Sequence, residues 1–406
     1  MINVIGLGYI GLPTALAFAT SGHEVVGSDC SQEVVEQLQS DVAKFNEPGL
    51  DELYREALDK GIRFSQRYER ADVYVVAVPT PYDKFTNKVD PSHVVDAVDK
   101  ILDVAPQGAI IVVESTLSPG AIRKHVRACV ERRGLTPDKD VYLAHAPERI
   151  IPGAMLRELR ENNRIIGCDA PEIGERLKTL YSAFCNGQIV VTDVQTAEMC
   201  KVVENTFRAV NIAFANELAR ICRYEEMDVY EVIRICNMHP RVNILQPGPG
   251  VGGHCISVDP RFLIGDYPSL AKVIAAAMET NDSAPDFVLE RIRAIMRKEG
   301  MTDTTRVGLY GLTYKENVDD VRESPTLQLL ELQRRRLAQP LNVYDPYVTR
   351  DLVERQYHDL DEFLAANDLV VIMVKHREII DAMEKLRGKV VLDCHNVCKL
   401  PNAYKL

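Results

Sequence analysis

The sequence predicts an α/β protein with two Rossmann-like doubly wound domains joined by a central helical dimerisation domain. Three observations lead to this prediction. Short apolar runs alternate with helix-length segments in the N-terminal part of the chain, and a long helical stretch follows from Thr196 to about Glu225. Beyond Thr305 the strand-and-glycine pattern returns, since Arg306–Leu312 resembles the opening of the chain.

The first domain opens with a strand, a glycine turn and a helix in that order. Ile2–Ile5 is β-rich, and the turn that follows carries Gly6, Gly8 and Gly11 in the spacing Gly-x-Gly-x-x-Gly. The first glycine of such a loop makes the turn, the second lets the backbone approach a pyrophosphate, and the third allows close helix–strand packing. The helix N-terminus then faces the phosphates, so the loop predicts a dinucleotide cradle.

The second strand, Glu24–Asp29, ends on an acid 18 residues beyond Gly11. An acid at this place accepts hydrogen bonds from the ribose hydroxyls and repels a 2′-phosphate. We therefore expect NAD rather than NADP, although Asp29 could also be a plain turn residue.

Three further runs are candidates for parallel strands: Val73–Val78, Ala109–Val113 and Val141–Ala144. Polar residues follow each of them, at the sheet edge where α/β proteins bind ligands. Thr80 and Thr116 are expected to line the cofactor crevice there. Glu148 could be a general base or only a loop carboxylate.

The long helical stretch carries too many apolar positions for a single stripe, which predicts burial between domains or between subunits. Lys201 and Asn205 are four residues apart and so share one face of this helix. Taken alone they resemble a solvated pair, but the apolar neighbours Val202, Val203 and Phe207 argue against full exposure. A lysine near buried surface can be tuned for proton transfer.

Two more helices are expected in the middle of the chain, at Asp228–Cys236 and at Ser269–Met296 with a break near Pro285. The polar segment 298–305 is a boundary. We therefore expect an NAD-binding domain over 1–192, a central helical domain over 193–298 and a C-terminal Rossmann-like domain over 299–406. Two nucleotide-binding sheets predict two nucleotide ligands.

A cysteine stands in a loop with four glycines, between Pro247 and Asp259. Backbone N–H groups can come close to a ligand there, and neighbouring dipoles that stabilise its thiolate make a thiol more nucleophilic. Cys255 is therefore a candidate nucleophile. Together with the dinucleotide cradle it suggests an oxidation that continues past an aldehyde to an acid.

Composition excludes several other classes of protein. The 406 residues carry a formal net charge of −11, which argues against a nucleic-acid binder. The ten scattered cysteines, the strand beginning at Ile2 and the absence of an apolar run of about 18 residues predict a cytoplasmic protein without a membrane span. Cys394 and Cys398 could form half a zinc site, but a second pair of ligands is missing, so we expect no metal.

Over its whole length the chain resembles the UDP-glucose/GDP-mannose dehydrogenase family. The shared motifs are Gly6–Pro13, Glu47–Leu50, Val78–Pro81, Glu114–Thr116, Lys201–Asn205, Gly252–Cys255 with Asp259, and Gly311–Lys315. Two segments, Pro147–Gly153 and His239–Gly250, are similar to the branch that oxidises UDP-N-acetyl-D-mannosamine to its uronic acid.

The resemblance implies two hydride transfers at C6 of the sugar, with two NAD and one water consumed. It implies a nucleophile at Cys255, an acid/base at Lys201 with its partner Asn205, thioester hydrolysis at Glu148, a water-holding hydroxyl at Thr116, and Asp259 beside the lysine. The implied cofactor residues are Gly6, Gly8, Tyr9, Ile10, Gly11, Asp29, Thr80, Thr116 and Arg322. The implied substrate residues are Arg149, Ile150, Lys201, Asn205, Arg208, His239, Arg241, Gly252, Tyr314 and Lys315.

The same resemblance implies a homodimer or a higher even oligomer in which Arg241 reaches across the interface. Arg261 departs from the pattern, because this branch often has an aromatic residue there, and it puts the fine fit of the substrate in doubt. Three alternatives stay open: oxidation of the C2 epimer UDP-N-acetyl-D-glucosamine, a one-step hydroxyacid-type dehydrogenase, and a nucleotide-sugar sensor without catalysis. The hydroxyacid type would leave Cys255 and the C-terminal sheet unexplained.

Overall fold

The structure, a computed structural model, describes residues 1–40, 47–335, 339–401 and 403–406. The chain divides into two compact units, Met1–Glu204 and Asn205–Leu406. Among the described residues, no helix has both the length and the apolar character that a membrane crossing needs.

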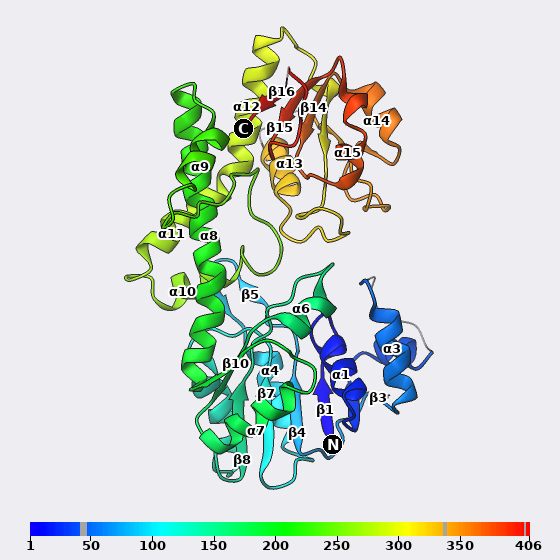
Figure 1. The fold of residues 1–406 in the computed structure, drawn as a ribbon, viewed down its shortest axis with the longest axis vertical. Helices are drawn as coiled ribbons and strands as arrows, with labels where there is room; N and C mark the ends of the chain where they lie inside the picture. Colours follow the sequence, from blue (N-terminus) through cyan, green and yellow to red (C-terminus); the bar gives the residue numbers. More distant parts are fainter. Residues whose placement is uncertain (41–46, 336–338, 402) are drawn as a thin grey trace. The chain divides into compact units, whose positions relative to one another are not determined.

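The N-terminal unit is built on an eight-stranded sheet with the order β10-β9-β8-β7-β4-β1-β2-β3 (Figure 1). Its strands are β1 (Ile2–Ile5), β2 (Val25–Ser28), β3 (Arg63–Ser65), β4 (Val73–Val76), β7 (Ala109–Val113), β8 (Val141–His145), β9 (Arg164–Cys168) and β10 (Ile189–Thr192). A short antiparallel ribbon joins β5 (Tyr82–Asp83) to β6 (Lys88–Val89). The expected parallel strands are confirmed, but β9 pairs antiparallel with β8, so this sheet is mixed.

Helices cover both faces of this sheet, as a doubly wound fold requires. One face carries α1 (Gly11–Thr20), α2 (Gln32–Gln39), α3 (Leu50–Asp59), α6 (Met155–Glu161) and α7 (Pro171–Tyr181). The other carries α4 (Ser92–Ile101), the π-helix η1 (Ile122–Arg127) and α5 (Ala128–Arg132). Because successive residues of a strand point to opposite faces, Ile110 and Ile111 of β7 enter different cores.

The middle of the chain is helical. Its elements are α8 (Val194–Tyr224), α9 (Val229–Cys236), α10 (Asp259–Asp266), α11 (Lys272–Asp282) and α12 (Ala284–Lys298). The long helix expected from Thr196 begins two residues earlier, and the boundary between the two units falls within it. The predicted break near Pro285 is confirmed, since α11 ends at Asp282 and Pro285 lies in the first turn of α12, where its missing N–H costs no helical bond.

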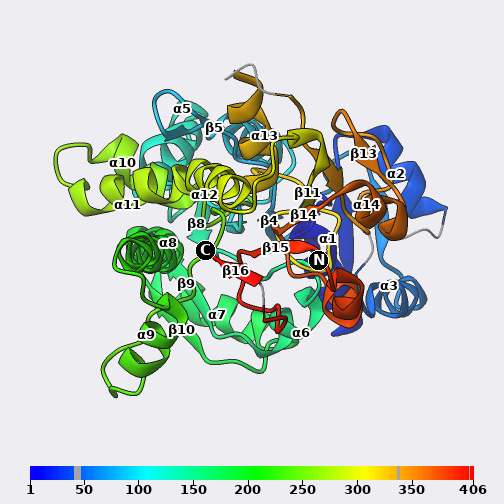
Figure 2. The same cartoon turned by 90° about the horizontal axis from the view of Figure 1, so that it is seen from above.

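Helix α9 packs beside the C-terminal half of α8 (Figure 2), where Ala215, Ala219 and Ile233 share a small core. A different face of α8 is exposed. Phe207, Phe214 and Ile221 follow one another at seven-residue spacing and are 65, 48 and 49% exposed. The predicted burial of this face against another subunit stays a prediction.

The C-terminal unit ends in a six-stranded parallel sheet with the order β13-β12-β11-β14-β15-β16. Its strands are β11 (Val307–Tyr310), β12 (Asn342–Tyr344), β13 (Gln356–Tyr357), β14 (Leu369–Ile372), β15 (Val390–Asp393) and β16 (Ala403–Lys405). The sequential order along the sheet is 3-2-1-4-5-6, the same as that of the first six strands of the N-terminal main sheet. The second Rossmann-like fold expected from Arg306–Leu312 is confirmed.

Two layers of helices enclose this second sheet (Figure 1). On one face lie α12 and α13 (Pro325–Arg335), and on the other α14 (Leu360–Ala366) and α15 (Arg377–Asp381). Single turns of 3-10 helix, η2 (Thr304–Arg306) and η3 (Met383–Leu386), precede β11 and β15. Alternate residues of β14 enter the two cores, Val371 on the α12 side and Val370 on the α14 side.

Candidate functional site

The glycine turn of the N-terminal unit has the shape of a phosphate cradle. Gly6 has φ +88°, and a Cβ there would lie 2.6 Å from the carbonyl oxygen of Ala77. A Cβ on Gly11 would overlap the carbonyl oxygen of Gly6, while a Cβ on Gly8 would meet nothing within 4 Å. The turn is therefore closed on the sheet side and open beside Gly8, where a pyrophosphate would bind. Tyr9, next to it, is 43% exposed.

The acid at the end of β2 supports the loop and remains partly exposed. Asp29 Oδ2 accepts the N–H of Leu7 at 2.8 Å, and Oδ1 accepts the N–H of Ser31 at 2.9 Å. Thr80 is buried beyond β4, and Thr116 is half-buried beyond β7. Because the carboxyl ends of parallel strands share one sheet edge, these residues and the turn fit a dinucleotide.

A buried cluster of charges surrounds Glu148, at the carboxyl end of β8. Arg164, the first residue of β9, makes an ion pair with Glu148 and lies 3.8 Å from Glu114, measured from Nη1 to Oε1. The side chains of all three are at most 5% exposed. The same guanidinium lies 5.0 Å from the ring centroid of Tyr181.

Each carboxylate of this cluster has additional donors. Glu148 Oε1 accepts the N–H of Arg149 at 2.7 Å, and Glu114 accepts the hydroxyls of Tyr181 at 2.7 Å and Thr14 at 3.2 Å. Burial raises the pKa of Glu114 to about 7, although the charge of Arg164 lowers it. Glu148 is thus a buried, ion-paired carboxylate rather than a solvated loop acid.

Lys201 is 5% exposed, which confirms the expectation that it is not fully exposed. Of the three apolar neighbours that indicated this, Val202 is buried, whereas Val203 and Phe207 are 45 and 65% exposed. At 100° per residue, position 203 lies about 200° around the helix from position 201. Lys201 lies near His145, whose pKa is lowered to about 4 by burial and by the charge of this lysine.

Two predicted substrate residues of the N-terminal unit follow Glu148. Arg149 pairs with Glu204 and also contacts the carbonyl oxygen of Asn163. Ile150 is buried.

In the C-terminal unit the structure brings Asn205, Cys255 and Asp259 together. Asn205 Nδ2 donates to Asp259 Oδ2 at 2.6 Å, and Asp259 is buried at the start of α10. The backbone N–H groups of Val258 and Asp259 donate to the carbonyl oxygen of Cys255, at 3.1 and 2.8 Å. Cys255 therefore occupies the turn that leads into α10, and its side chain is exposed.

Other predicted residues of this unit lie on its surface. Arg208, His239 and Arg241 are exposed, and so is Arg322, whose Nη2 lies 2.6 Å from Oδ2 of Asp320. Arg261, the departure from the family pattern, is held by Asp282 at 2.8 Å and by the carbonyl oxygen of Ser257 at 3.0 Å. Tyr314 and Lys315 are half-buried in the turn after β11.

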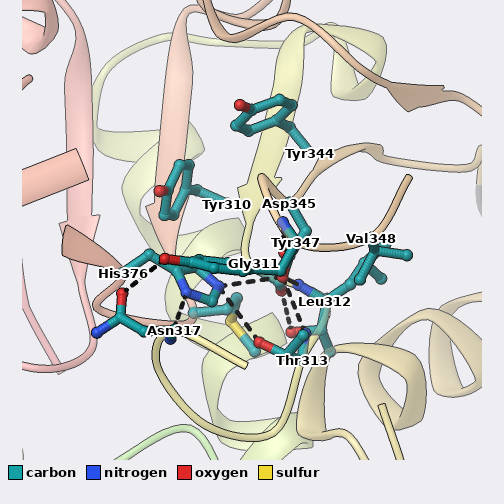
Figure 3. Close-up of polar contacts among 12 residues, drawn as sticks. Tyr310, Gly311, Leu312, Thr313, Asn317, Tyr344, Asp345, Tyr347, Val348 and His376 are labelled. Carbon is teal, nitrogen blue, oxygen red and sulfur yellow. Dashed lines mark hydrogen bonds and ion pairs between the residues drawn. The ribbon is translucent and has the colours of Figure 1, made fainter. Parts of the chain in front are cut away.

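Sequence reasoning gave no functional role to Arg164, Asp345 or His376. Arg164 opens a strand that was not predicted, and its role depends on carboxylates distant in sequence. Asp345 was detectable, because it ends β12 as Asp29 ends β2. It forms a buried polar cluster with His376 and the turn after β11 (Figure 3).

Comparisons with known proteins cover almost the whole chain. Residues 1–185 match the NAD binding domain of the UDP-glucose/GDP-mannose dehydrogenase family, 195–283 its central domain, and 308–400 its UDP binding domain. A UDP-N-acetyl-D-mannosamine dehydrogenase of Methanococcus vannielii is 40% identical over 98% of this chain and 92% of its own length. An NDP-N-acetyl-D-galactosaminuronic acid dehydrogenase of Ralstonia solanacearum is 40% identical over 97% of this chain and 95% of its own.

A solved structure described as the UDP-D-ManNAc dehydrogenase from Pyrococcus horikoshii is also similar. It is 35% identical with a TM-score of 0.92, and the match covers 100% of this chain and 99% of that one.

Proposed function

The chain belongs to the UDP-glucose/GDP-mannose dehydrogenase family, and we propose that it oxidises UDP-N-acetyl-D-mannosamine at C6 to UDP-N-acetyl-D-mannosaminuronate. The family makes it an NAD-dependent nucleotide-sugar dehydrogenase. The observation that favours the acetamido sugar is the 40% identity to relatives named for UDP-N-acetyl-D-mannosamine and for an N-acetylgalactosaminuronic acid. UDP-N-acetyl-D-glucosamine is the alternative substrate.

NAD, held by the Gly6–Gly11 turn, Asp29, Thr80, Thr116 and Arg322, supplies the hydride acceptor for both oxidation steps. Lys201 takes the proton of the C6 hydroxyl, directly or through water, as the alcohol becomes an aldehyde. Its burial, at 5% exposure, supports this role, because the surrounding protein then fixes the position of the amine.

Cys255 retains the aldehyde. Its thiolate adds to C6 as a thiohemiacetal, and loss of the second hydride leaves a thioester. Asn205, whose amide is fixed by Asp259, and nearby backbone amides stabilise the oxyanions. The exposed position of Cys255 in a glycine-rich turn supports this role.

Glu148 assists water in the last step. Attack on the thioester carbon breaks the C–S bond, releases the uronic acid and returns the thiol. The ion pair with Arg164 supports a carboxylate of fixed orientation. Glu148 would take the proton of the attacking water, which Thr116 would hold.

We assign the nucleotide sugar to the residues that match the family's contacts. These are Arg149, Ile150, Lys201, Asn205, Arg208, His239, Arg241, Gly252, Tyr314 and Lys315. We also propose three domains, at 1–192, 193–298 and 299–406, and an even oligomer that buries the exposed face of α8, with Arg241 reaching the neighbouring site. The seven-residue spacing of Phe207, Phe214 and Ile221 supports a helix-to-helix interface.

The test is the NADH yield of a single turnover, with mass analysis of the sugar. The wild-type enzyme should give about two NADH per sugar. Cys255→Ser should stop at the aldehyde or at a stable adduct with about one NADH, because serine is a much weaker nucleophile at neutral pH. Lys201→Ala should impair the first oxidation as well.

The matched control is Cys236→Ser, which removes another exposed thiol of the same unit and should leave the yield at the wild-type value. Full conversion to the uronic acid by Cys255→Ser at near wild-type rate would remove the cysteine from the mechanism. A panel of UDP-N-acetylhexosamines in the same assay separates the mannosamine and glucosamine epimers.

A further inference from the structure

The turn that follows β11 is held in place by two residues from the ends of other strands (Figure 3). Asp345, just beyond β12, accepts the N–H of Leu312 at 2.6 Å and that of Thr313 at 3.0 Å, both on Oδ2. His376, beyond β14, accepts the N–H of Asn317 on Nδ1 at 2.9 Å. The two ends of the turn are thus fixed to neighbouring strands of the sheet.

The two clamping residues also contact each other. Since Nδ1 of His376 accepts a hydrogen bond, the ring proton lies on Nε2, 3.1 Å from Asp345 Oδ2 and 3.2 Å from Thr313 Oγ1. The side chains of His376 and Asp345 have no exposed area. Hydrogen bonds from His376, Thr313 and Tyr347 outweigh the effect of burial and hold the pKa of Asp345 below its usual value.

The turn after β11 differs from the glycine turn after β1 in the N-terminal sheet. Asp29 occupies the equivalent strand end and also accepts a loop N–H, but it is partly exposed and can meet a ribose. Asp345 is covered by His376, and Thr313, which stands where Gly8 stands in the first turn, is buried. The second turn therefore holds its shape through side chains instead of offering an open backbone cradle.

The middle of the clamped turn reaches the cysteine segment. A Cβ on Gly252 would lie 2.5 Å from Cβ of Tyr314, and one on Gly253 would lie 2.7 Å from the tyrosine ring. The N–H of Gly253 donates to the carbonyl oxygen of Arg322 at 2.9 Å. Tyr314 thus packs directly on the backbone two residues before Cys255.

From this chain of contacts we propose that His376 and Asp345 are positioning residues of the nucleotide-sugar site. They hold the turn that carries Tyr314 and Lys315, and through Tyr314 they support the Gly252–Gly253 backbone. Neither touches the sugar nucleotide itself. The proposal rests on the proposed function, which assigns Tyr314 and Lys315 to the substrate.

Three substitutions at His376 separate its hydrogen bond with the Asn317 N–H from its contact with Asp345. His376→Asn retains an acceptor for the Asn317 N–H but does not reach Asp345, whereas His376→Gln retains a donor towards Asp345 and loses that acceptor. His376→Ala removes both. The matched control is Glu378→Gln, which changes a half-buried contact two residues away, where Glu378 accepts the hydroxyls of Tyr310 and Tyr344.

We expect His376→Ala to raise KM for the nucleotide sugar at least about tenfold, with kcat within about threefold and KM for NAD within about twofold of wild type. The Asn and Gln variants should lie between wild type and alanine. The Kd of UDP alone, by calorimetry on the full chain, should rise in parallel. Glu378→Gln should leave all these constants within about twofold.

Amide hydrogen exchange gives a readout that needs no catalysis. Residues 312–317 should lose protection in His376→Ala, while β11 and β14 retain theirs. If wild type oxidises no nucleotide sugar, the proposed function fails. Amide exchange of residues 312–317 in the variants then still tests whether His376 holds the turn after β11. An unchanged KM for the sugar in an active enzyme, unchanged exchange of the turn, or equal changes in Glu378→Gln would each overturn the positioning role.

Discussion

Arg164→Met should destabilise the N-terminal unit strongly, because it leaves Glu114 and Glu148 buried without their shared cation. The side chains of these three residues are at most 5% exposed, so water cannot solvate the two carboxylates once the guanidinium is gone. Removing one partner of a buried ion pair costs about 3–5 kcal/mol. For a unit spanning Met1–Glu204, that corresponds to a Tm lower by roughly 6–20 °C.

The loss of stability in Arg164→Met should also depend on pH. The pKa of Glu114 is raised by burial to about 7 in the folded protein, above its ordinary value of 4.5. A carboxyl with a raised folded pKa contributes most stability below its unfolded pKa and loses that contribution as the pH rises through the folded pKa. Without Arg164 the pKa of Glu114 rises further, so the deficit of the variant should be larger at about pH 8.5 than at about pH 6.

Scanning calorimetry at both pH values measures the effect, and amide exchange of β8 and β9 assigns it to this unit. The double variant Arg164→Met/Glu114→Gln is the matched control, because it removes one of the two stranded carboxylates and should recover part of the loss. A deficit below about 1 kcal/mol at pH 8.5, or one equal at both pH values, would refute a buried cluster that depends on its charges.

Two further predictions concern the cofactor and the assembly. Asp29 should favour NAD over NADP by at least about tenfold in kcat/KM, or ~1.4 kcal/mol, because it repels a 2′-phosphate; comparable efficiencies would show that it does not meet the ribose. Phe214→Asp should convert the proposed dimer into an inactive monomer in sedimentation at assay concentration, because it places a charge in the exposed apolar face of α8; an active wild-type monomer would contradict the dimer.

The dinucleotide turn and the internal repeat were predictable because their causes are local in sequence. The positive φ of Gly6 and the close approach of Gly11 to the Gly6 carbonyl oxygen arise within one turn of the chain, and the structure has the expected open side at Gly8. Asp29 and Asp345 each directly follow a strand whose residues are all buried, β2 and β12. The return of a strand and a glycine after residue 305 therefore predicted the second sheet.

The environment of Lys201 and the strands beyond β8 were not predictable in the same way. Its apolar neighbours in sequence correctly indicated that Lys201 is not fully exposed, but they gave no sign that it lies near His145. Strand β9 reverses direction against β8, a pairing that no local pattern specifies. Such features depend on which elements meet after the chain has folded.

By itself, the sequence determined the fold class, the NAD turn and the family, because glycine spacing and hydrophobic periodicity act over a few residues. Only the tertiary structure decided that Arg164 joins Glu114 to Glu148, and that His376 and Asp345 hold the Tyr314 turn. These contacts join residues from different strands. The free energies of these contacts depend on burial and on partners that are distant in sequence. The chain has neither the burial nor the partners in place until the sheets have formed.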